Sequence, residues 1–338
     1  MKQYIEHEQL TALPGVAIRM GSEDQDQDIK QQIEIFNATK DVLGANWTIQ
    51  PEDLVSEYQV REHFDPTTQS WLAEKDGETV GVAECYWFDL PLEKRRVMRV
   101  GVNWRKEFFG TPMPNILFEL AEGKCREMAA KMETDLNLVF SSWTMKSAQK
   151  RHDVFKAHGY TPVRYFFNMT RDNQKALADY PLPDGIVIRG AEENEYRKVF
   201  EAIEEAFKDH WGWSESTEEQ YQEWIKHRHF QPELWKIAWD GDEVAGTVLN
   251  YVDEVENEEY NRKRGYTETI CVRRQWRGKG IAKAIIAESI RMFTTMGMEE
   301  CALGVDAENP SGALKLYQDL GFEEVEAQTS IVLGKPFE

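Results

Sequence analysis

The pattern of apolar and polar residues in the second half of the chain predicts alternating strands and helices. Residues 265–273 are rich in β-branched residues and alternate in polarity, which is typical of a strand. From Ile281 to Met296 the apolar residues recur at helical spacing and predict an amphipathic helix. Beyond it, the pattern predicts a strand at 300–305, a helix at 311–320 that stops at Gly321, and a strand from Phe322 to near Leu333.

The elements upstream of this region occur twice along the chain. In the second half they are a strand at 186–189, helices at 192–207 and 217–227, and a hairpin of strands 234–239 and 244–250. In the first half they are a strand at 16–19, a helix that includes 31–37, and a hairpin at 71–82. The segment between the halves contains two prolines and little periodic apolar pattern. We therefore expect two domains, 1–172 and 186–338, joined by a linker at 173–185.

Composition and charge narrow the class of protein. A chain of 338 residues is long enough for two domains that each bury a core, and 41% apolar residues with 12% aromatics indicate a globular protein. The net charge of −20 disfavours nucleic acid and anionic membrane surfaces as partners. A cationic or amine ligand is compatible with this charge, although solubility explains the charge equally well.

The cysteines and the start of the chain bear on its compartment. The four cysteines are widely spaced without a Cys-x-x-Cys pair, so we expect buried free thiols in a reducing compartment. The first residues include no apolar signal region, and no run approaches a membrane span. We therefore expect a cytoplasmic protein. The histidines form no metal-ligand pattern and no nucleophilic triad is legible, so no metal is expected.

The turn at 275–280, Gln-Trp-Arg-Gly-Lys-Gly, joins a predicted strand to a predicted helix. Free N–H groups at a helix start favour an anion, and glycines let the backbone approach a phosphate closely. Four cations lie in or beside the turn: Arg273, Arg274, Arg277 and Lys279. The glycine spacing fits neither a dinucleotide fingerprint nor a P-loop. We therefore expect a different class of phosphate-bearing ligand.

Two motifs in this order resemble the GNAT acetyltransferase superfamily. The turn fits the family's Gln/Arg-x-x-Gly-x-Gly/Ala loop, which wraps the pyrophosphate of acetyl-coenzyme A. Residues 309–322, Asn-Pro-Ser-Gly-Ala-Leu-Lys-Leu-Tyr-Gln-Asp-Leu-Gly-Phe, resemble its second cofactor-binding motif. The resemblance implies acetyl-coenzyme A as cosubstrate, held by these residues: Ile270, Cys271, Val272, Arg273, Gln275, Arg277, Gly278, Lys279, Gly280, Ile281, Ala282, Asn309, Ala313 and Tyr317.

The resemblance also implies catalytic roles for two residues. Tyr317 stands where family members place the acid that protonates the departing thiolate; its alternative is a half-buried helix tyrosine. Glu268 is the best candidate for the base that deprotonates the amine, with an exposed strand glutamate as the alternative. Asn309 is expected to contact the cofactor, as in relatives. Capping of a helix that has Pro310 at its first position explains an asparagine here equally well.

The acceptor is expected near the segment 209–213, Asp-His-Trp-Gly-Trp, where the family places an acceptor-binding loop. His210, Trp211 and Trp213 are therefore substrate-binding candidates, although tryptophan packing against the core is an equal alternative. Four glutamates within 254–259 lie in a predicted loop, which is either a solvated surface or an attraction for a cationic acceptor.

The first copy differs where chemistry would occur. After Val102, the counterpart of Val272, the Gly-x-Gly spacing is absent and Pro112 and Pro114 remove amide donors. Phe155 stands in the place of Tyr317, and Met98 in that of Glu268. We expect a degenerate, non-catalytic GNAT-like domain at 1–172 and a catalytic one at 186–338.

The expected fold is therefore α/β (α+β), with two tandem GNAT-like folds, each a mixed, mostly antiparallel twisted sheet flanked by helices, an arrangement similar to that of mycothiol synthase. The expected function is transfer of an acetyl group from acetyl-coenzyme A to a primary amine of a small molecule. Acetylation of a protein N-terminus or lysine, and a non-catalytic acyl-coenzyme A sensor, are the alternatives. We expect a monomer or homodimer; the acceptor, the acyl chain length and the oligomeric state stay open.

Overall fold

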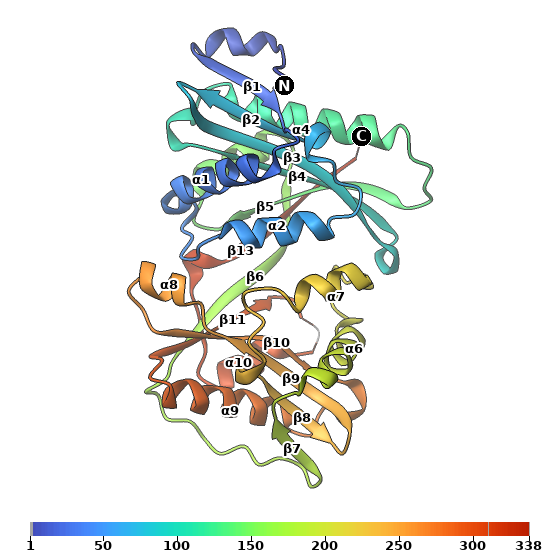
Figure 1. The fold of residues 1–338 in the computed structure, drawn as a ribbon, viewed down its shortest axis with the longest axis vertical. Coiled ribbons are helices and arrows are strands. Elements are labelled where there is room, and N and C mark those ends of the chain that lie inside the picture. The colour runs from blue at the N-terminus through green and yellow to red at the C-terminus, as the bar shows by residue number, and fades with distance from the viewer. Residues whose placement is uncertain (1–2, 310, 338) are drawn as a thin grey trace. The chain divides into compact units, whose positions relative to one another are not determined.

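The computed structural model describes residues 3–309 and 311–337 and divides into two compact units (Figure 1). The first unit contains the chain up to Tyr165 together with the residues from Ala327 onward, and the second runs from Phe166 to Glu326. Each unit is a mixed sheet flanked by helices, so the predicted fold class is confirmed.

The sheet of the second unit has the strand order β7-β8-β9-β10-β11-β6. Only β10 and β11 run parallel; the other neighbours are antiparallel. A short strand, β12, also pairs with β6. The bounds are β6 Thr161–Asp172, β7 Ile186–Arg189, β8 Lys236–Asp240, β9 Glu243–Tyr251, β10 Arg264–Val272, β11 Glu300–Asp306 and β12 Glu323–Glu324.

The sheet of the first unit repeats this topology in the order β1-β2-β3-β4-β5-β13, with β4 and β5 as its parallel pair. The bounds are β1 Val16–Met20, β2 Ser70–Lys75, β3 Glu78–Leu90, β4 Arg95–Trp104, β5 Asn137–Met145 and β13 Ser330–Pro336. The predicted repeat of elements is therefore a repeat of sheet topology.

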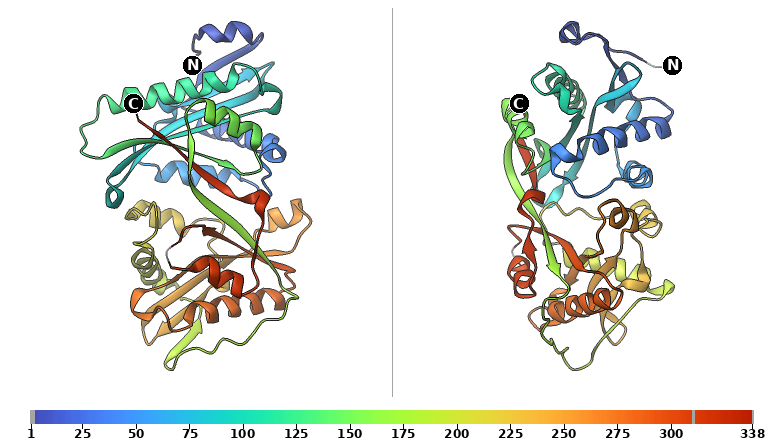
Figure 2. Two further views of the ribbon diagram at one scale, coloured as in Figure 1. Left: turned by 180° about the vertical axis from the view of Figure 1, so that it is seen from behind. Right: turned by 90° about the vertical axis from the view of Figure 1, so that its left-hand side faces the viewer.

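The helices flank these sheets (Figure 2). Those of the first unit are α1 Gln25–Leu43, α2 Pro51–Val60, α3 Pro66–Gln69, α4 Met113–Ala129 and α5 Gln149–Ala157. Those of the second unit are α6 Tyr196–Phe207, α7 Glu218–Trp224, α8 Glu254–Glu259, α9 Ile281–Thr295 and α10 Ala313–Asp319. None of the helices in the described residues has the length and apolarity needed to cross a bilayer.

Strand alternation decides which helix covers which face of the second sheet. Side chains on one face, including Ile237 and Trp239, pack with α6, whereas Ala238 and Val248 on the other face pack with α9. The central strands are therefore buried on both sides. All four cysteines are buried and free, as predicted.

The compact units differ from the predicted boundaries at 172 and 186, because the two halves exchange their last strands. Residues 166–172 of β6, the end of the first half, pair with β11. The last strand of the chain, β13, pairs instead with β5. The segment 173–185 contains no helix or strand.

Three local expectations were wrong. The helix predicted at 311–320 begins at Ala313, with Gly312 rather than Asn309 at its N-cap; Pro310 lies outside the described residues. The strand predicted from Phe322 to Leu333 is broken into β12 and β13. The acidic segment forms helix α8, because Asp253 caps it, and Glu256 is buried against Arg262.

Candidate active site

A cavity of about 430 Å³ lies in the second unit where β10 ends and α9 begins. Its wall combines an apolar floor with the basic turn and one helix of the motif at 309–322. The lining residues are Ala206, His210, Ile270, Cys271, Val272, Trp276, Arg277, Gly278, Gly280, Ile281, Ala282, Lys283, Ser311, Ala313, Leu316 and Tyr317.

The turn at its mouth has the backbone that close approach of a phosphate requires. Gly278 and Gly280 have φ angles of +76° and +84°, which residues with a side chain rarely adopt. A Cβ atom at either glycine would meet nothing within 4 Å, so the backbone faces open space. Trp276 is buried beneath the turn and donates to Asp240 Oδ2 at 2.8 Å. The turn is thus anchored from below and open above.

The basic side chains of the turn are largely committed to carboxylates of the same unit. Arg273 pairs with Glu205 and Glu243, while Arg274 and Arg277 both pair with Asp209. Lys279, in contrast, forms no ion pair with any residue that the structure describes. Free backbone N–H groups and this one lysine are therefore the groups that the turn offers to an anion.

Strands β10 and β11 pair only at their start, through residues 264–266 of β10, and then separate. Past that point the register of β10 with β9 shifts between Glu268 and Cys271, a β-bulge in which Thr269 adopts φ +48°. Separation and bulge together leave a slot beside Ile270 and Val272, which line the cavity.

Glu268 lies at the edge of this slot. The side chain is half-buried, and its Oε1 accepts a hydrogen bond from the Gly304 N–H of β11 at 3.0 Å. Removal from water raises the pKa of the Glu268 carboxyl to about 7, against the smaller opposing effect of that hydrogen bond. A carboxyl with this pKa can exchange protons near neutral pH.

Tyr317 faces the cavity from α10 and is 6% exposed. Its hydroxyl forms no hydrogen bond with the described residues. Burial, followed by the charges of Glu268 and Cys271, raises the pKa of Tyr317. The phenol is therefore protonated at neutral pH, and it lies close enough to Glu268 for the carboxylate charge to raise its pKa.

Only one of the three predicted acceptor-binding residues lines the cavity. His210 lines the cavity, and burial lowers its pKa. Trp211 packs near Phe166, and Trp213 has a buried indole nitrogen; neither lines the cavity. The structure thus brings His210 to the site, and the two tryptophans lie away from it.

Sequence reasoning missed an aromatic stack near Glu268. The rings of His229, Tyr251 and Tyr266 are stacked, with centroids 4.0 Å and 4.8 Å apart. Burial and then the charge of Glu268 raise the pKa of Tyr251, so the stack and the carboxyl are neighbours. One tyrosine in each of the neighbouring strands β9 and β10 was the available signal, and His229 joins the pair from a loop that is distant in sequence.

Most predicted cofactor-binding residues line the cavity, but four do not: Arg273, Gln275, Lys279 and Asn309. Arg273 is held by its carboxylate partners, and Gln275 and Lys279 are exposed on the turn. Asn309 Oδ1 accepts from the Ser311 N–H at 2.9 Å, which orders the start of the segment rather than capping a helix. Lys283 and Ser311 line the cavity and were not predicted.

The register corrects one match between the copies. Glu268 pairs with Leu249, and the two hairpins align with Leu249 at the position of Glu84, whose partner is Gly101. The counterpart of Glu268 in the first unit is therefore Gly101 and not Met98. The match to Met98 was anchored on Val102, whereas the registers place Trp104 at the position of Val272. The bulge in β10 then adds one residue that β4 lacks.

The slot itself is filled in the first unit. Counting back from Gly159 and Gly321, Arg151 stands where Ala313 stands. Arg151 is buried and donates to Val102 O at 2.8 Å and to Asn103 Oδ1 at 2.9 Å, between the separating strands. Burial lowers its pKa, and no carboxylate among the described residues pairs with it.

Comparisons with known proteins agree with this geometry. Residues 197–322 match the model of the acetyltransferase (GNAT) family. A stretch of 91 residues, 27% of the chain, is 31% identical to N-alpha-acetyltransferase MAK3 of Arabidopsis thaliana and spans 45% of that relative. The chain therefore covers about half the length of this curated relative.

Solved structures resemble the whole chain. A GCN5-related N-acetyltransferase from Sphaerobacter thermophilus matches with a TM-score of 0.68 and 22% identity, covering 95% of this chain and 96% of that one. A tandem GNAT protein from the clavulanic acid biosynthesis pathway matches with a TM-score of 0.62 and 12% identity, covering 94% and 98%. The chain therefore has the tandem GNAT fold, and its residues 197–322 match the acetyltransferase (GNAT) family.

Proposed function

We propose that the second unit transfers an acetyl group from acetyl-coenzyme A to a primary amine, by direct attack of the amine within a ternary complex. The observation that carries this proposal is the juxtaposition of Tyr317 and Glu268 beside a cavity whose mouth is a helix N-terminus with two open glycines. The residues present fit the cosubstrate: the turn offers amides to a pyrophosphate, and the slot between β10 and β11 is lined by apolar side chains that suit an extended arm.

In this proposal Glu268 takes a proton from the acceptor ammonium, since its pKa of about 7 leaves it able to do so near neutral pH. The neutral amine then attacks the thioester carbon, which forms the C–N bond and breaks the C–S bond. Tyr317 gives its proton to the departing thiolate, and its raised pKa keeps it protonated until that moment. The surplus proton on the new amide nitrogen leaves through solvent and restores the Tyr317 phenol after the phenol has protonated the thiolate. Holding both substrates in one site supplies much of the remaining rate.

The acceptor class has two candidates. A small-molecule amine is the first, and the stacked rings of His229, Tyr251 and Tyr266 offer aromatic faces to it. Protein N-termini are the second, favoured by the stretch similar to a named N-alpha-acetyltransferase. The tandem layout resembles mycothiol synthase, but layout does not fix an acceptor, so the proposal stops at the amine class.

Release of coenzyme A from acetyl-coenzyme A tests the proposal, measured against a panel of small amines, amino sugars and peptides with free N-termini. The expected result is turnover with at least one acceptor and its loss in Tyr317→Phe. Tight cofactor binding without turnover of any acceptor would favour a non-catalytic sensor instead.

A further inference from the structure

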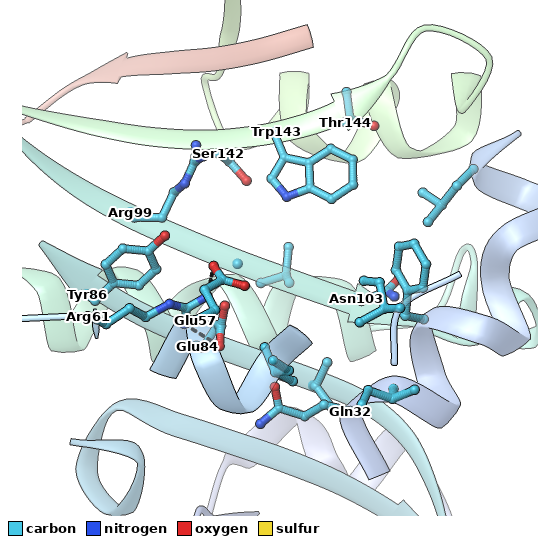
Figure 3. A pocket seen from close by; sticks show the side chains of 18 of the residues that line it. Gln32, Glu57, Arg61, Glu84, Tyr86, Arg99, Asn103, Ser142, Trp143 and Thr144 are labelled. Carbon is cyan, nitrogen blue, oxygen red and sulfur yellow. Dashed lines mark hydrogen bonds and ion pairs between the residues drawn. The ribbon is translucent and has the colours of Figure 1, made fainter. Parts of the chain in front are cut away.

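A second cavity, of about 210 Å³, lies wholly within the first unit, and its residues are outside the proposed transfer site (Figure 3). Its walls come from α1 and α2 on one side and from β3, β4 and β5 on the other. Ile33, Phe36 and Trp143 give it an apolar and aromatic portion. Because it is smaller than the roughly 300–1,000 Å³ typical of drug-sized ligands, it suits a small molecule.

The acidic groups of this cavity are already neutralised. Arg61 pairs with Glu84 at 3.0 Å and with Glu57 at 2.5 Å. The Tyr58 hydroxyl lies 2.9 Å from the same Glu84 oxygen. Gly101 makes room for this arrangement, since a Cβ atom there would lie 2.9 Å from Glu84 Cγ. The two carboxylates are therefore held by protein partners and leave little negative charge for a ligand.

The basic groups, by contrast, are in excess. Arg99 bonds only to the Ser141 hydroxyl, and Arg151 only to the neutral oxygens of Val102 and Asn103, among the residues that the structure describes. Both arginines line the cavity. A guanidinium without a carboxylate, partly removed from water, favours a ligand that brings an anion.

Uncommitted polar groups line the same space. Thr144 is 0% exposed, and its Oγ1 has no hydrogen-bond partner among the described residues. The Tyr86 hydroxyl likewise forms no hydrogen bond within that part of the chain. Buried polar atoms are rarely left without partners. Figure 3 shows Tyr86, Arg99, Ser142 and Thr144 around the cavity that Glu57 and Glu84 also border.

From these contacts we propose that the first unit is a binding site for a small organic carboxylate with an apolar body, its carboxylate held by Arg99. The site lies at the place that corresponds to the acceptor side of the second unit, because Gly101, the register counterpart of Glu268, lines the same cavity as Arg99.

Calorimetric titration of the full chain tests this, with 3-phenylpropionate and 3-phenylpropylamine as probes that share a skeleton and differ in charge. The expected result is binding of the carboxylate and at least tenfold weaker binding of the amine. Arg99→Gln should weaken carboxylate binding at least tenfold, and Arg99→Glu should reverse the preference. Lys106→Gln, which removes a 65% exposed cation of the same unit outside the cavity, should leave both affinities unchanged.

Two further measurements locate the site and guard against misfolding. Quenching of Trp143 by the carboxylate should disappear in Trp143→Phe, and Tyr86→Phe, which removes a single oxygen, should weaken binding a few-fold with unchanged thermal unfolding. Lys279→Gln, which changes the turn of the second unit, should leave the affinity for 3-phenylpropionate unchanged. Any of four results would overturn the proposal. The first two are equal affinity for the amine and the carboxylate, and unchanged carboxylate binding in Arg99→Gln. The others are loss of carboxylate binding in Lys279→Gln, and no binding of 3-phenylpropionate at millimolar concentration.

Discussion

The two units share one sheet topology, and the space between their parallel central strands is used in opposite ways. In the second unit the strands separate beside a bulge, and Ala313 leaves the slot open to the cavity. In the first unit β4 pairs regularly with β3 over ten residues, and Arg151 fills the slot with hydrogen bonds to Val102 and Asn103. A single small side chain on the last helix thus decides whether the same fold has room for a ligand arm.

The sharpest way to break this difference is to give the second slot the arginine of the first. Ala313→Arg should place a guanidinium in the cavity, and acetyl-coenzyme A affinity should fall by up to about 100-fold, since overpacking costs about 1–3 kcal/mol. Calorimetric titration measures the affinity. Lys315→Arg, which changes a 77% exposed side chain on the same helix, is the control and should bind normally.

Removal of one oxygen tests the second difference between the copies. Tyr317→Phe places in α10 the residue type that the first copy has at the matching position, Phe155. Because the proton donor is lost, kcat should fall by about 10²-fold, the lower end of the range for general acid catalysis. Steady-state kinetics with the best acceptor measures it. The reciprocal Phe155→Tyr should confer no activity on a chain that carries Tyr317→Phe; a rescue would show that the first unit is competent.

The raised pKa of Glu268 predicts a pH dependence. A base works only when deprotonated, so kcat/KM should rise with pH up to about 7 and then level off. Glu268→Gln should remove that limb and lower the plateau on the order of tenfold, because water can replace a base in part. A profile that keeps its limb in the variant would assign the titration to another group.

The same carboxyl should affect stability. Its folded-state pKa lies above the unfolded value, so its contribution to stability is fully present below the unfolded pKa and is lost as pH rises through about 7. Glu268→Gln should therefore unfold at a higher temperature than the parent chain at pH 8, and the difference should shrink toward pH 4. Thermal unfolding followed by circular dichroism measures both.

The smallest expected effect concerns the turn. Lys279→Gln should weaken acetyl-coenzyme A binding only a few-fold, since one exposed cation contributes about 0.5–1 kcal/mol. Arg274→Gln should have less effect still, because this arginine is tied to Asp209. Increasing salt should diminish the difference between Lys279→Gln and the parent chain.

The sequence predicted the elements and the turn well, because hydrophobic period and glycine positions are local signals. Glu268 and Tyr317 could be named from their places in the motifs. Their mutual influence could not, since it depends on strands that separate in three dimensions. The Met98 match was wrong for a related reason. It was anchored on Val102 where the registers place Trp104, and a one-residue bulge, which leaves no mark in the pattern, shifts the remaining pairings by one more. Arg151 was overlooked because a basic residue on a short helix looks like a surface residue until its burial is known.

The exchange of last strands has a consequence for how this chain can be divided. A cut in the segment 173–185 would leave the second sheet without β6, and removal of the residues after Ala327 would strip β13 from the first sheet rather than from the second. Either truncation exposes an unpaired strand edge, a template for aggregation. Neither half is therefore a self-sufficient module, and the copy with the filled slot supplies a structural part that the other copy lacks.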